Sequence, residues 1–346
     1  MRARLVPVLV VVFAGCGPTT GRAPNRNGAA DMASPPAGDL AVSVGDGGSQ
    51  QGCPPPPLPA GSEVQIAPAF APYYTAYLLG AVPGVPDPLG GTVVKAGDPS
   101  TLLVAGGSES DTGGIYAIGV QRDACNHIIG FVGTATKVAD TPYVDANLVY
   151  GPQQLLVYTG WPQFNLAQLP AGAMTPARNT DLRTLGMSSM DDQGPGGHGF
   201  VPASVPAATG QLRLVTWPAG HWYHVTATLN GGLFDVTALA TPVTLPNNPG
   251  GFAYVPAGSP GFGKQSIILA EWNQTDRTQD RVAVYDADDN GDPVPSTRQE
   301  FMTKFPRPWG AYFEPLTGDY MFLTWGAGGE DRVYIVQGFV PPPPVL

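Results

Sequence analysis

Between about residue 85 and residue 340 the chain alternates short apolar runs with segments rich in polar residues, Gly and Pro. One type of run is mainly apolar and ends in Gly or Trp, and the end residues of its five copies lie 54, 56, 55 and 53 positions apart. Short apolar runs bounded by turn residues predict β-strands, and a constant period predicts a repeated structural unit. The copies occupy 102–107, 156–161, 212–217, 267–272 and 320–325.

Further strands flank each copy. Preceding strands are predicted at 91–94, 147–152, 199–202, 251–256 and 310–315, and following strands at 115–120, 165–169, 224–229, 281–286 and 332–337. A fourth strand is visible in four copies, at 128–133, 182–185, 233–239 and 299–305. Four-stranded units that repeat around an axis form a β-propeller.

The last copy has no fourth strand, whereas residues 75–79 form a spare apolar strand at the front. Pairing of this strand with the last unit would close the ring. We therefore predict an all-β fold, a β-propeller of five four-stranded blades closed by an N-terminal strand. A six-bladed ring is the near alternative, because residues 62–90 are hard to divide into strands. A β-sandwich is the further alternative, and it would need no such period.

Composition agrees with this prediction. Gly 46 and Pro 39 form a quarter of the 346 residues, which is too many turn residues for a helical bundle or a doubly wound α/β enzyme. Only 13% of the residues are charged, against roughly 25% in an average domain. The net charge of −10 argues against a nucleic-acid partner, whose binding needs a basic surface.

The N-terminus predicts export. Arg2 and Arg4 precede an apolar stretch at 5–15, which is too short to span a bilayer as a helix. It ends in Phe13-Ala14-Gly15-Cys16, which resembles a bacterial lipobox. The resemblance implies a signal peptide at 1–15, lipidation of Cys16 and a lipid anchor in the cell envelope. Gly17, rather than Asp, after the cysteine favours the outer membrane. The alternative is an ordinary secretory signal.

Residues 16–61 are predicted to be a disordered tether, because they are rich in Gly and Pro and hold no aromatic residue. The propeller is expected at 62–340, and a Pro-rich tail at 341–346. With Cys16 lipidated, Cys53 and Cys125 form a candidate disulfide that would fasten the tether to the folded domain. The alternative is two free thiols too far apart to meet.

Two segments, 251–260 and 314–319, resemble those of uncharacterised exported bacterial β-propeller proteins. The resemblance covers most of 85–340 and concerns inner-strand and turn motifs, so it implies the fold more than an activity. In such proteins an acidic residue often precedes the Gly-Phe or Gly-Ala of the inner strand. Gly250 and Trp309 stand at those places here, which argues against catalysis.

Antiparallel order places the loops after the second strands at one end of every blade. This face is expected to carry aromatic side chains and their neighbours: Trp161, Phe164, Trp217, His221, Trp222, Glu271, Trp272 and Trp325. One interpretation is that the aromatic residues pack between blades. The other is a surface that binds a sugar or peptide, with Trp161, Trp217, Trp222, Trp272 and Trp325 as ligand-binding residues.

The mouth of a central channel would be lined by residues near the starts of the first strands: Gly90, Asp145, His198, Gly250 and Trp309. Propeller hydrolases use acids or amides at such a mouth to bind calcium or transfer protons. The candidate catalytic residues are Asp145, His198 and Glu271, and Glu314 is a further acid that would have to reach inward.

One loop resembles half of a calcium-binding motif. Asp286, Asp288, Asn290 and Asp292 match the start of the pattern, but Thr297 replaces the bidentate Glu at the twelfth position. The alternative is a bare hairpin turn. No other cofactor is expected.

Three functions remain open at this stage. The leading hypothesis is a cell-envelope lipoprotein whose propeller binds or scaffolds a protein or carbohydrate partner. The alternatives are a calcium-dependent hydrolase of a lactone or glycan, and a structural envelope protein.

Overall fold

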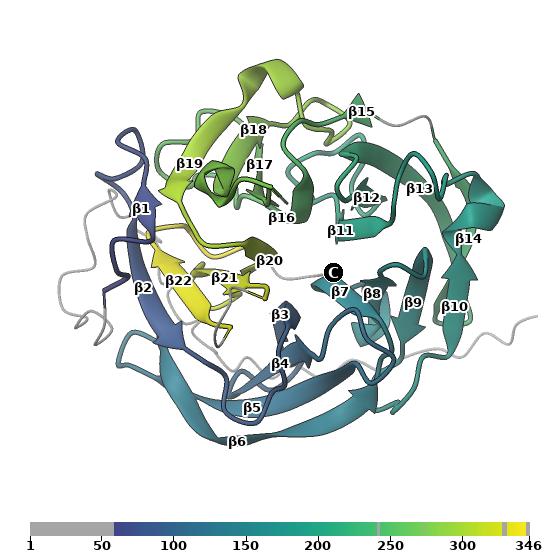
Figure 1. Ribbon diagram of the computed structural model, residues 1–346, viewed down its shortest axis with the longest axis horizontal. Coiled ribbons are helices and arrows are strands. Elements are labelled where there is room, and N and C mark those ends of the chain that lie inside the picture. The colour runs from purple at the N-terminus through teal and green to yellow at the C-terminus, as the bar shows by residue number, and fades with distance from the viewer. Residues whose placement is uncertain (1–58, 241–242, 274, 327–330, 344–346) are drawn as a thin grey trace, which may run out of the picture. The chain divides into compact units, whose positions relative to one another are not determined.

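The computed structural model describes residues 59–343 except 241–242, 274 and 327–330, and these residues form five antiparallel sheets around a common centre (Figure 1). Each sheet is one blade, and the blades follow one another in chain order around the ring. The prediction of a five-bladed β-propeller is confirmed, and the six-bladed and sandwich alternatives are wrong.

The strands of each blade run from the centre outward. Blade 1 contains β3 (Leu89–Val94), β4 (Thr101–Gly106), β5 (Gly114–Arg122) and β6 (Ile128–Asp140). Blade 2 contains β7 (Val144–Tyr150), β8 (Leu156–Gly160), β9 (Asn165–Leu169) and β10 (Arg178–Asp181). Blade 3 contains β11 (Pro195–Phe200), β12 (Leu212–Thr216), β13 (His221–Asn230) and β14 (Leu233–Leu239), with β15 (Val243–Thr244) also paired to β13.

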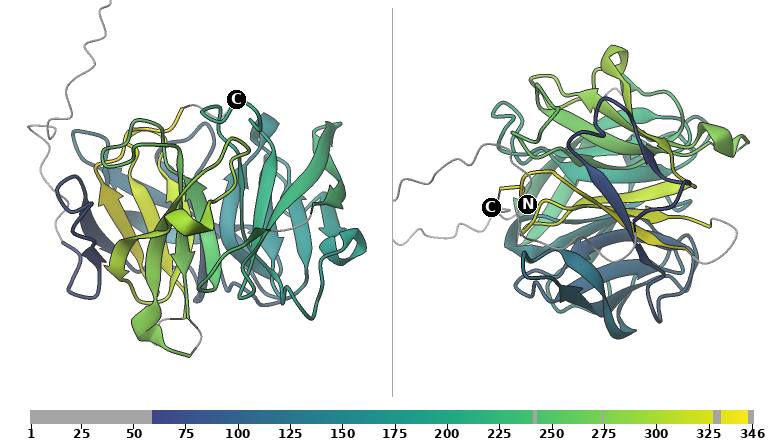
Figure 2. Two further views of the ribbon diagram at one scale, coloured as in Figure 1. Left: turned by 90° about the horizontal axis from the view of Figure 1, so that it is seen from above. Right: turned by 90° about the vertical axis from the view of Figure 1, so that its left-hand side faces the viewer.

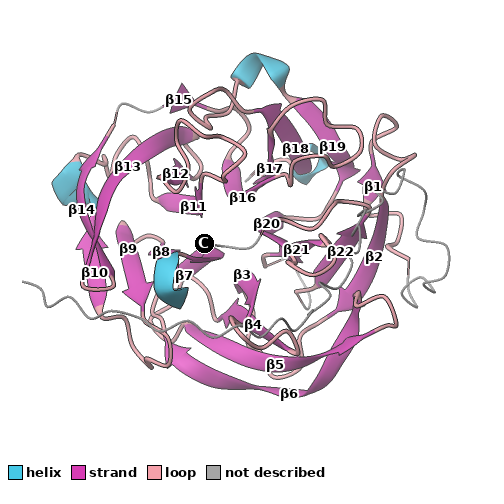
Figure 3. Cartoon of the chain, turned by 180° about the vertical axis from the view of Figure 1, so that it is seen from behind, coloured by secondary structure: helices cyan, strands magenta, loops and turns pink. Residues whose placement is uncertain are grey.

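Blade 4 contains β16 (Pro249–Tyr254), β17 (Ser266–Glu271), β18 (Arg281–Asp286), β19 (Gln299–Lys304) and the outer β1 (Gln65–Ile66). Blade 5 contains β20 (Pro308–Phe313), β21 (Tyr320–Thr324), β22 (Val333–Gln337) and β2 (Thr75–Gly80). Short 3-10 helices lie between strands (Figure 3): η1 (Pro152–Gln154), η2 (Leu182–Leu185), η3 (Arg277–Gln279) and η4 (Pro295–Thr297). Within the described ranges, no helix is apolar over a length that would cross a bilayer.

The N-terminal strand closes the ring as predicted. β2 pairs antiparallel with β22, with Thr75 opposite Gln337 and Leu78 opposite Tyr334. Figure 2 (right) shows β1 and β2 beside the last strands of the chain. The closure also completes a core, because Phe70 and Tyr74 pack with Phe339 and the outer strands of blade 4. Residues from the two ends of the domain therefore share one hydrophobic cluster.

The fourth strand of blade 2 differs from the prediction. It is β10, and the expected strand at 182–185 is the helix η2. The Asp181 side chain accepts a hydrogen bond from Arg183 N, which is the bond of a helix N-cap. Leu182 is buried beneath this turn. The apolar residues that suggested a strand therefore anchor a helical turn to the core.

Glycine brings the inner strands together at the hub of the propeller. Every inner strand shifts register near its start, as in a β-bulge. A Cβ atom on Gly251 would lie 2.4 Å from Trp309 O, so only glycine permits this approach of backbones. Similar close contacts surround Gly91, Gly197 and Gly310.

The side chain of Asn147 fills the centre at this level. Its Nδ2 donates to Phe252 O and Ala311 O at 3.1 Å each, and its Oδ1 accepts from Phe252 N at 3.2 Å. One buried amide thus links blades 2, 4 and 5. Packed backbone and this amide occupy the hub where an open channel was expected.

Only one of the two cysteines in the predicted disulfide, Cys125, lies among the described residues. Cys125 lies in the turn between β5 and β6, where its backbone N–H donates to Asp123 Oδ1 at 2.8 Å. Cys53 and the lipobox cysteine Cys16 lie outside the described residues. The disulfide and the lipidation therefore stay predictions.

Candidate functional site

One end of the propeller collects the starts of the inner strands and the ends of the second strands. Leu89 lies opposite Gly106, and Val144 lies opposite Gly160. The other three blades have the same pairing, with Pro195 opposite Thr216, Pro249 opposite Glu271 and Pro308 opposite Thr324. We call this end the loop face.

Five tryptophans form a cluster at the loop face, above the hub. Trp217 and Trp272 stack at 4.7 Å with an interplanar angle of 8°, and Trp309 meets them edge-on at 5.5 and 5.4 Å. Trp161 and Trp325 flank them at 6.0 Å from Trp217 and 5.0 Å from Trp272. The exposed fractions of Trp217, Trp272 and Trp309 are 4%, 7% and 0%. The cluster therefore packs against itself over the hub, and only Trp161 and Trp325 are partly exposed.

Two expectations about aromatic residues need correction. Trp309 was expected to line a channel, but it stands at the centre of the tryptophan cluster. Trp222 was expected at the loop face, but it is fully buried between blades 3 and 4, where its ring lies 4.5 Å from Phe252. Phe164 is buried in another core cluster beneath Arg183. The fourfold repeat of Trp161, Trp217, Trp272 and Trp325 thus marks packing around the axis.

Beside the tryptophan cluster lie two carboxyl groups, the fully buried Asp145 and the partly buried Glu109. Asp145 Oδ1 accepts from Trp309 Nε1 at 2.9 Å. Burial and the nearby Glu109 raise the pKa of Asp145 well above its usual range, and burial raises the pKa of Glu109 to about 8. Within the described chain, neither Asp145 Oδ2 nor Glu109 Oε1 has a hydrogen-bond partner. At neutral pH these groups favour the protonated form.

Sequence reasoning did not identify Glu109. It lies in the turn after β4, two residues beyond Gly107, which is the residue that stands where the other four blades carry tryptophan, and its φ of 60° lies in the left-handed region. No short motif surrounds it. The one available signal nearby was the departure of blade 1 from the repeat, where Gly107 replaces tryptophan two residues before Glu109.

His198 lies away from Asp145. All five inner strands shift register near their starts, and the hub glycine of blade 3 is Gly197, which packs against Gly250 and Gly251, rather than Gly199. Gly196 therefore takes the place at the mouth that was assigned to His198, and His198 lies opposite Leu214. His198 Nε2 lies 3.0 Å from Val157 O, and burial lowers the pKa of the imidazole to about 4. The structure therefore places a neutral histidine between blades 2 and 3, and no hydrogen bond joins it to Asp145.

The other candidate acids have partners of their own. Glu271 is fully buried and accepts from Arg298 Nε at 2.9 Å and from Tyr285 OH at 2.8 Å. Glu314 lies at the opposite end of blade 5, where it accepts from Thr317 N at 2.7 Å and from Arg122 Nη2 at 2.8 Å. Neither carboxylate reaches the hub. Gly90 and Gly250 contribute only backbone there, beside Ser108 and Trp309.

The aspartate-rich loop joins two blades. Asp292 Oδ1 accepts from Arg213 Nε at 2.9 Å and Trp222 Nε1 at 3.0 Å, and Asp292 Oδ2 lies 2.5 Å from His224 Nε2. Arg213 is only 1% exposed, so the ion pair is buried.

The remaining residues of the motif shape the turn. Asp288 Oδ1 accepts from Asn290 N at 2.8 Å and Asp292 N at 2.9 Å, and Asp286 lies 3.6 Å from Lys264 Nζ. His221 faces Asp192 at 2.6 Å instead of joining His224. Across the described ranges, no group of three or more His, Cys, Asp or Glu side chains is placed to hold a metal ion.

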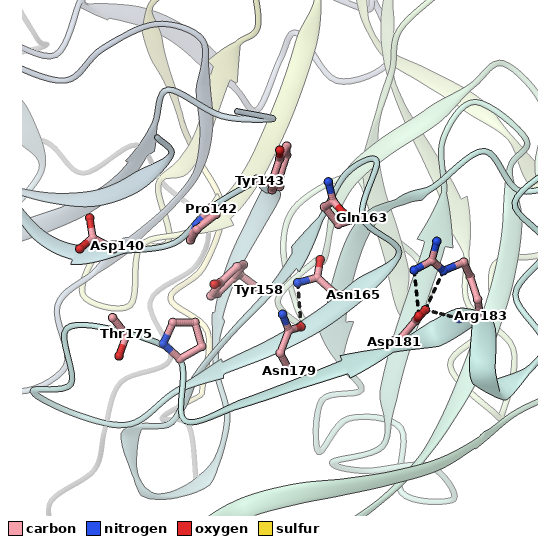
Figure 4. Close-up of a pocket in the computed structure, with 11 residues that line it drawn as sticks. Asp140, Pro142, Tyr143, Tyr158, Gln163, Asn165, Thr175, Asn179, Asp181 and Arg183 are labelled. Atoms are coloured by element: carbon pink, nitrogen blue, oxygen red, sulfur yellow. Dashed lines mark hydrogen bonds and ion pairs between the residues drawn. The ribbon is translucent and has the colours of Figure 1, made fainter. Parts of the chain in front are cut away.

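A groove on blade 2 was not predicted from the sequence (Figure 4). It has a volume of about 610 Å³, begins at the loop face and is bordered by the end of β6 in blade 1. We call it the blade-2 groove. It is lined by tyrosine and proline rings, side-chain amides and an ion pair: Asp140, Pro142, Tyr143, Tyr158, Gln163, Asn165, Thr175, Pro176, Asn179, Asp181 and Arg183.

Local structure positions these side chains. Asn165 Nδ2 donates to Asn179 Oδ1 at 2.7 Å, which joins β9 to β10. Arg183 makes a bidentate pair with Asp181, with Nε and Nη2 at 2.9 and 2.8 Å from its oxygens. Tyr158 is 1% exposed, and burial raises the pKa of its hydroxyl. Tyr143 adopts a φ of 61°, and its carbonyl accepts from Trp161 N at 3.0 Å.

Comparisons with known proteins place the fold in context. No family model matches the sequence, and no curated protein matches it. Among solved structures, a luciferin-regenerating enzyme matches with a TM-score of 0.44 and 9% identity, over 82% of this chain and 98% of that chain. A gluconolactonase from Xanthomonas campestris matches with a TM-score of 0.44 and 13% identity, over 81% and 96%.

The aldose sugar dehydrogenase of Streptomyces coelicolor, in its PQQ-bound form, matches with a TM-score of 0.40 and 12% identity, over 75% and 83%. At such identities and TM-scores the similarity assigns no activity, and the site has to be argued from its own residues.

Proposed function

We propose that this protein is an exported, lipid-anchored binding protein whose propeller holds a small polar ligand in the blade-2 groove. The observation that carries the proposal is the groove itself. Its volume of about 610 Å³ falls within the range of roughly 300–1,000 Å³ that is usual for small-molecule sites. By contrast, the tryptophan cluster and the hub are filled by their own packing.

Binding is favoured over hydrolysis by the state of the carboxylates. Hydrolysis of a lactone or glycan needs an acid and a base that face the same substrate atoms. In the groove, Asp181 is held by Arg183, and Asp140 lies 2.6 Å from Lys137 Nζ. The acids predicted for catalysis bind Trp309, Arg298 or Arg122 instead.

A fragment screen tests the position of the site. We would soak crystals of the protein with a mixed library of small neutral, acidic, basic and aromatic compounds. The proposal predicts that the fragments which bind gather on Tyr143, Tyr158, Asn165 and Asn179. Fragments that gather only elsewhere, or none at all, would refute it.

Substitution supplies the matched control. Asn179→Ala removes a groove amide, whereas Asn230→Ala removes an exposed amide of blade 3 that donates to Asp235 Oδ2 at 2.9 Å. Fragment binding should weaken in Asn179→Ala and persist in Asn230→Ala.

The anchor rests on the lipobox-like sequence alone. Metabolic labelling with a radioactive fatty acid should mark the wild-type chain and leave Cys16→Ser unmarked, and only the wild type should sediment with membranes. Equal labelling of both chains would refute lipidation at Cys16. A wild-type chain that is secreted without lipid would support an ordinary signal peptide.

A further inference from the structure

We propose that the ligand of the blade-2 groove is a neutral saccharide, an uncharged ring compound that carries several hydroxyl groups. This inference deepens the proposed function and rests on it. Three properties of the groove carry it: balanced charge, mixed hydrogen-bonding capacity and apolar ring surfaces (Figure 4).

The first property is charge balance. The groove contains Asp140, Asp181 and Arg183, and each has an opposite charge in contact. The bidentate geometry between Asp181 and Arg183 uses both carboxylate oxygens. A charged ligand would lose hydration on entry and find no uncompensated partner, which is costly. A neutral ligand avoids this penalty.

The second property is a mixture of free donors and acceptors. Asn165 Nδ2 donates to Asn179 Oδ1, which leaves the Asn179 amide hydrogens and Asn165 Oδ1 for other partners. Asn165 is 8% exposed, and its Oδ1 has no hydrogen-bond partner within the described part of the chain. Such an unsatisfied buried acceptor favours a ligand that donates a hydrogen bond.

Glycine keeps space for this acceptor. Asn165 lies opposite Gly160 in the register of β9 and β8, and a Cβ atom on Gly160 would come 2.0 Å from Asn165 Oδ1. Any other residue at position 160 would displace the amide. A hydroxyl group both donates and accepts, so neighbouring hydroxyls match an acceptor and a donor held side by side.

The third property is the apolar surface between these polar groups. The solvent-accessible rings of Tyr143, Pro142 and Pro176 line the groove, whereas Tyr158, 1% exposed, lies almost wholly beneath its surface. Aromatic rings with a polar tip offer a face for apolar contact and a hydroxyl for hydrogen bonding. The carbon-bound hydrogens of a sugar ring can pack on such faces while its hydroxyls reach the amides.

The experiment uses the full chain and three named classes of probe. Neutral probes are oligomers of glucose, mannose and N-acetylglucosamine, acidic probes are oligogalacturonates, and the cationic probe is spermidine. Binding is measured by isothermal titration calorimetry in low and high sodium chloride. We expect one of the neutral series to bind, with an affinity that changes less than about twofold with salt, because no charge is neutralised.

Variants then assign the contact to the groove. Asn179→Ala and Tyr158→Phe should each lower the affinity for the neutral probe by about tenfold, which is the effect of one lost hydrogen bond. Asn230→Ala should leave the affinity unchanged. Because Tyr158→Phe removes only a hydroxyl, it keeps the test informative if Asn179→Ala disturbs the fold, and near-ultraviolet circular dichroism checks both.

The outcomes separate the two proposals. If only oligogalacturonate or spermidine binds, and Asn179→Ala abolishes that binding, the proposal of a neutral saccharide is wrong. The groove would still be the binding site. Fragments bound in the groove without affinity for any neutral probe would likewise overturn the saccharide. No fragment in the groove would overturn the proposed function itself.

Discussion

The tryptophan cluster and the blade-2 groove both reach the loop face, yet they are built from opposite kinds of residue. Four of the clustered tryptophans occupy one repeated position, and they meet because equivalent positions near the axis lie close together. The groove depends on residues that do not recur. Asn165 lies opposite the last residue of β8, and the same place holds Gly114 in blade 1 and Arg281 in blade 4.

This difference separates packing from recognition in a repeat protein. A side chain that recurs around the ring finds its own copies at the hub, where it fills space. A side chain present in a single blade has no copies to meet and can face solvent or a ligand. Non-recurring side chains occur both in the core, as Asn147 does, and in the blade-2 groove that we propose as the binding site.

The strongest test of the comparison is Trp217→Ala. Trp217 contacts Trp161, Trp272 and Trp309, so its truncation should lower the free energy of unfolding by about 3–5 kcal/mol, measured by urea denaturation. Trp161→Ala, at the partly exposed edge of the cluster, should lower the free energy of unfolding by less than Trp217→Ala does. A loss below about 1 kcal/mol for Trp217→Ala would show that the cluster is loosely packed and free to serve as a binding platform.

The contact of Asp292 with Arg213, which joins blades 3 and 4, should give the next largest effect on stability. Asp292→Asn leaves the buried Arg213 without its counter-charge and should cost about 3 kcal/mol in the same assay. Because Arg213, Trp222 and His224 already occupy the carboxylate, millimolar calcium should leave the melting temperature of the wild type unchanged. A calcium-dependent rise in melting temperature would show that the loop binds the ion.

The two carboxyl groups beside the cluster predict a dependence on pH. Burial raises the pKa of Glu109 from 4.5 to about 8, so the folded protein holds more protons than the unfolded chain between these values. The free energy of unfolding should therefore fall as pH rises from about 4.5 to 8, through the contribution of this group.

The control for this effect is Glu109→Gln, which cannot ionise. Between about pH 4.5 and 8, the free energy of unfolding should fall more in the wild type than in this variant. His198 acts in the opposite sense at lower pH, since its pKa is lowered from 6.5 to about 4, and the comparison with the variant removes its contribution. Parallel pH profiles for both proteins would contradict the assignment.

The smallest effect on stability belongs to the groove. Asn179→Ala removes one exposed amide contact and should change the free energy of unfolding by less than about 0.5 kcal/mol. Thermal unfolding of this variant beside Asn230→Ala provides the measurement. A cost above about 2 kcal/mol would indicate that the groove amides serve the fold, and the contrast between cluster and groove would fail.

The fold was predictable because its information is local and periodic. Each blade repeats the same strand pattern, and the spare strand at 75–79 is visible as an apolar run. The site was far less predictable. His198 was assigned to the wrong position because three glycines, Gly196, Gly197 and Gly199, lie around it, and the sequence does not show which of them packs at the hub. The partners of Asp292 lie 68 to 79 positions away in another blade.

The sequence alone determined the repeated four-stranded unit and the spare strand that closes the ring, since strand length, turn residues and period are properties of neighbouring residues. It favoured five blades over six, and the structure decided between them. Only the tertiary structure decided that five tryptophans fill the loop face above the hub, that the aspartate loop clasps Arg213, and that Asn165 and Asn179 meet in an open groove. The physical reason is that side-chain contacts between blades depend on register and on radial closure. Both arise only when all five sheets are in place.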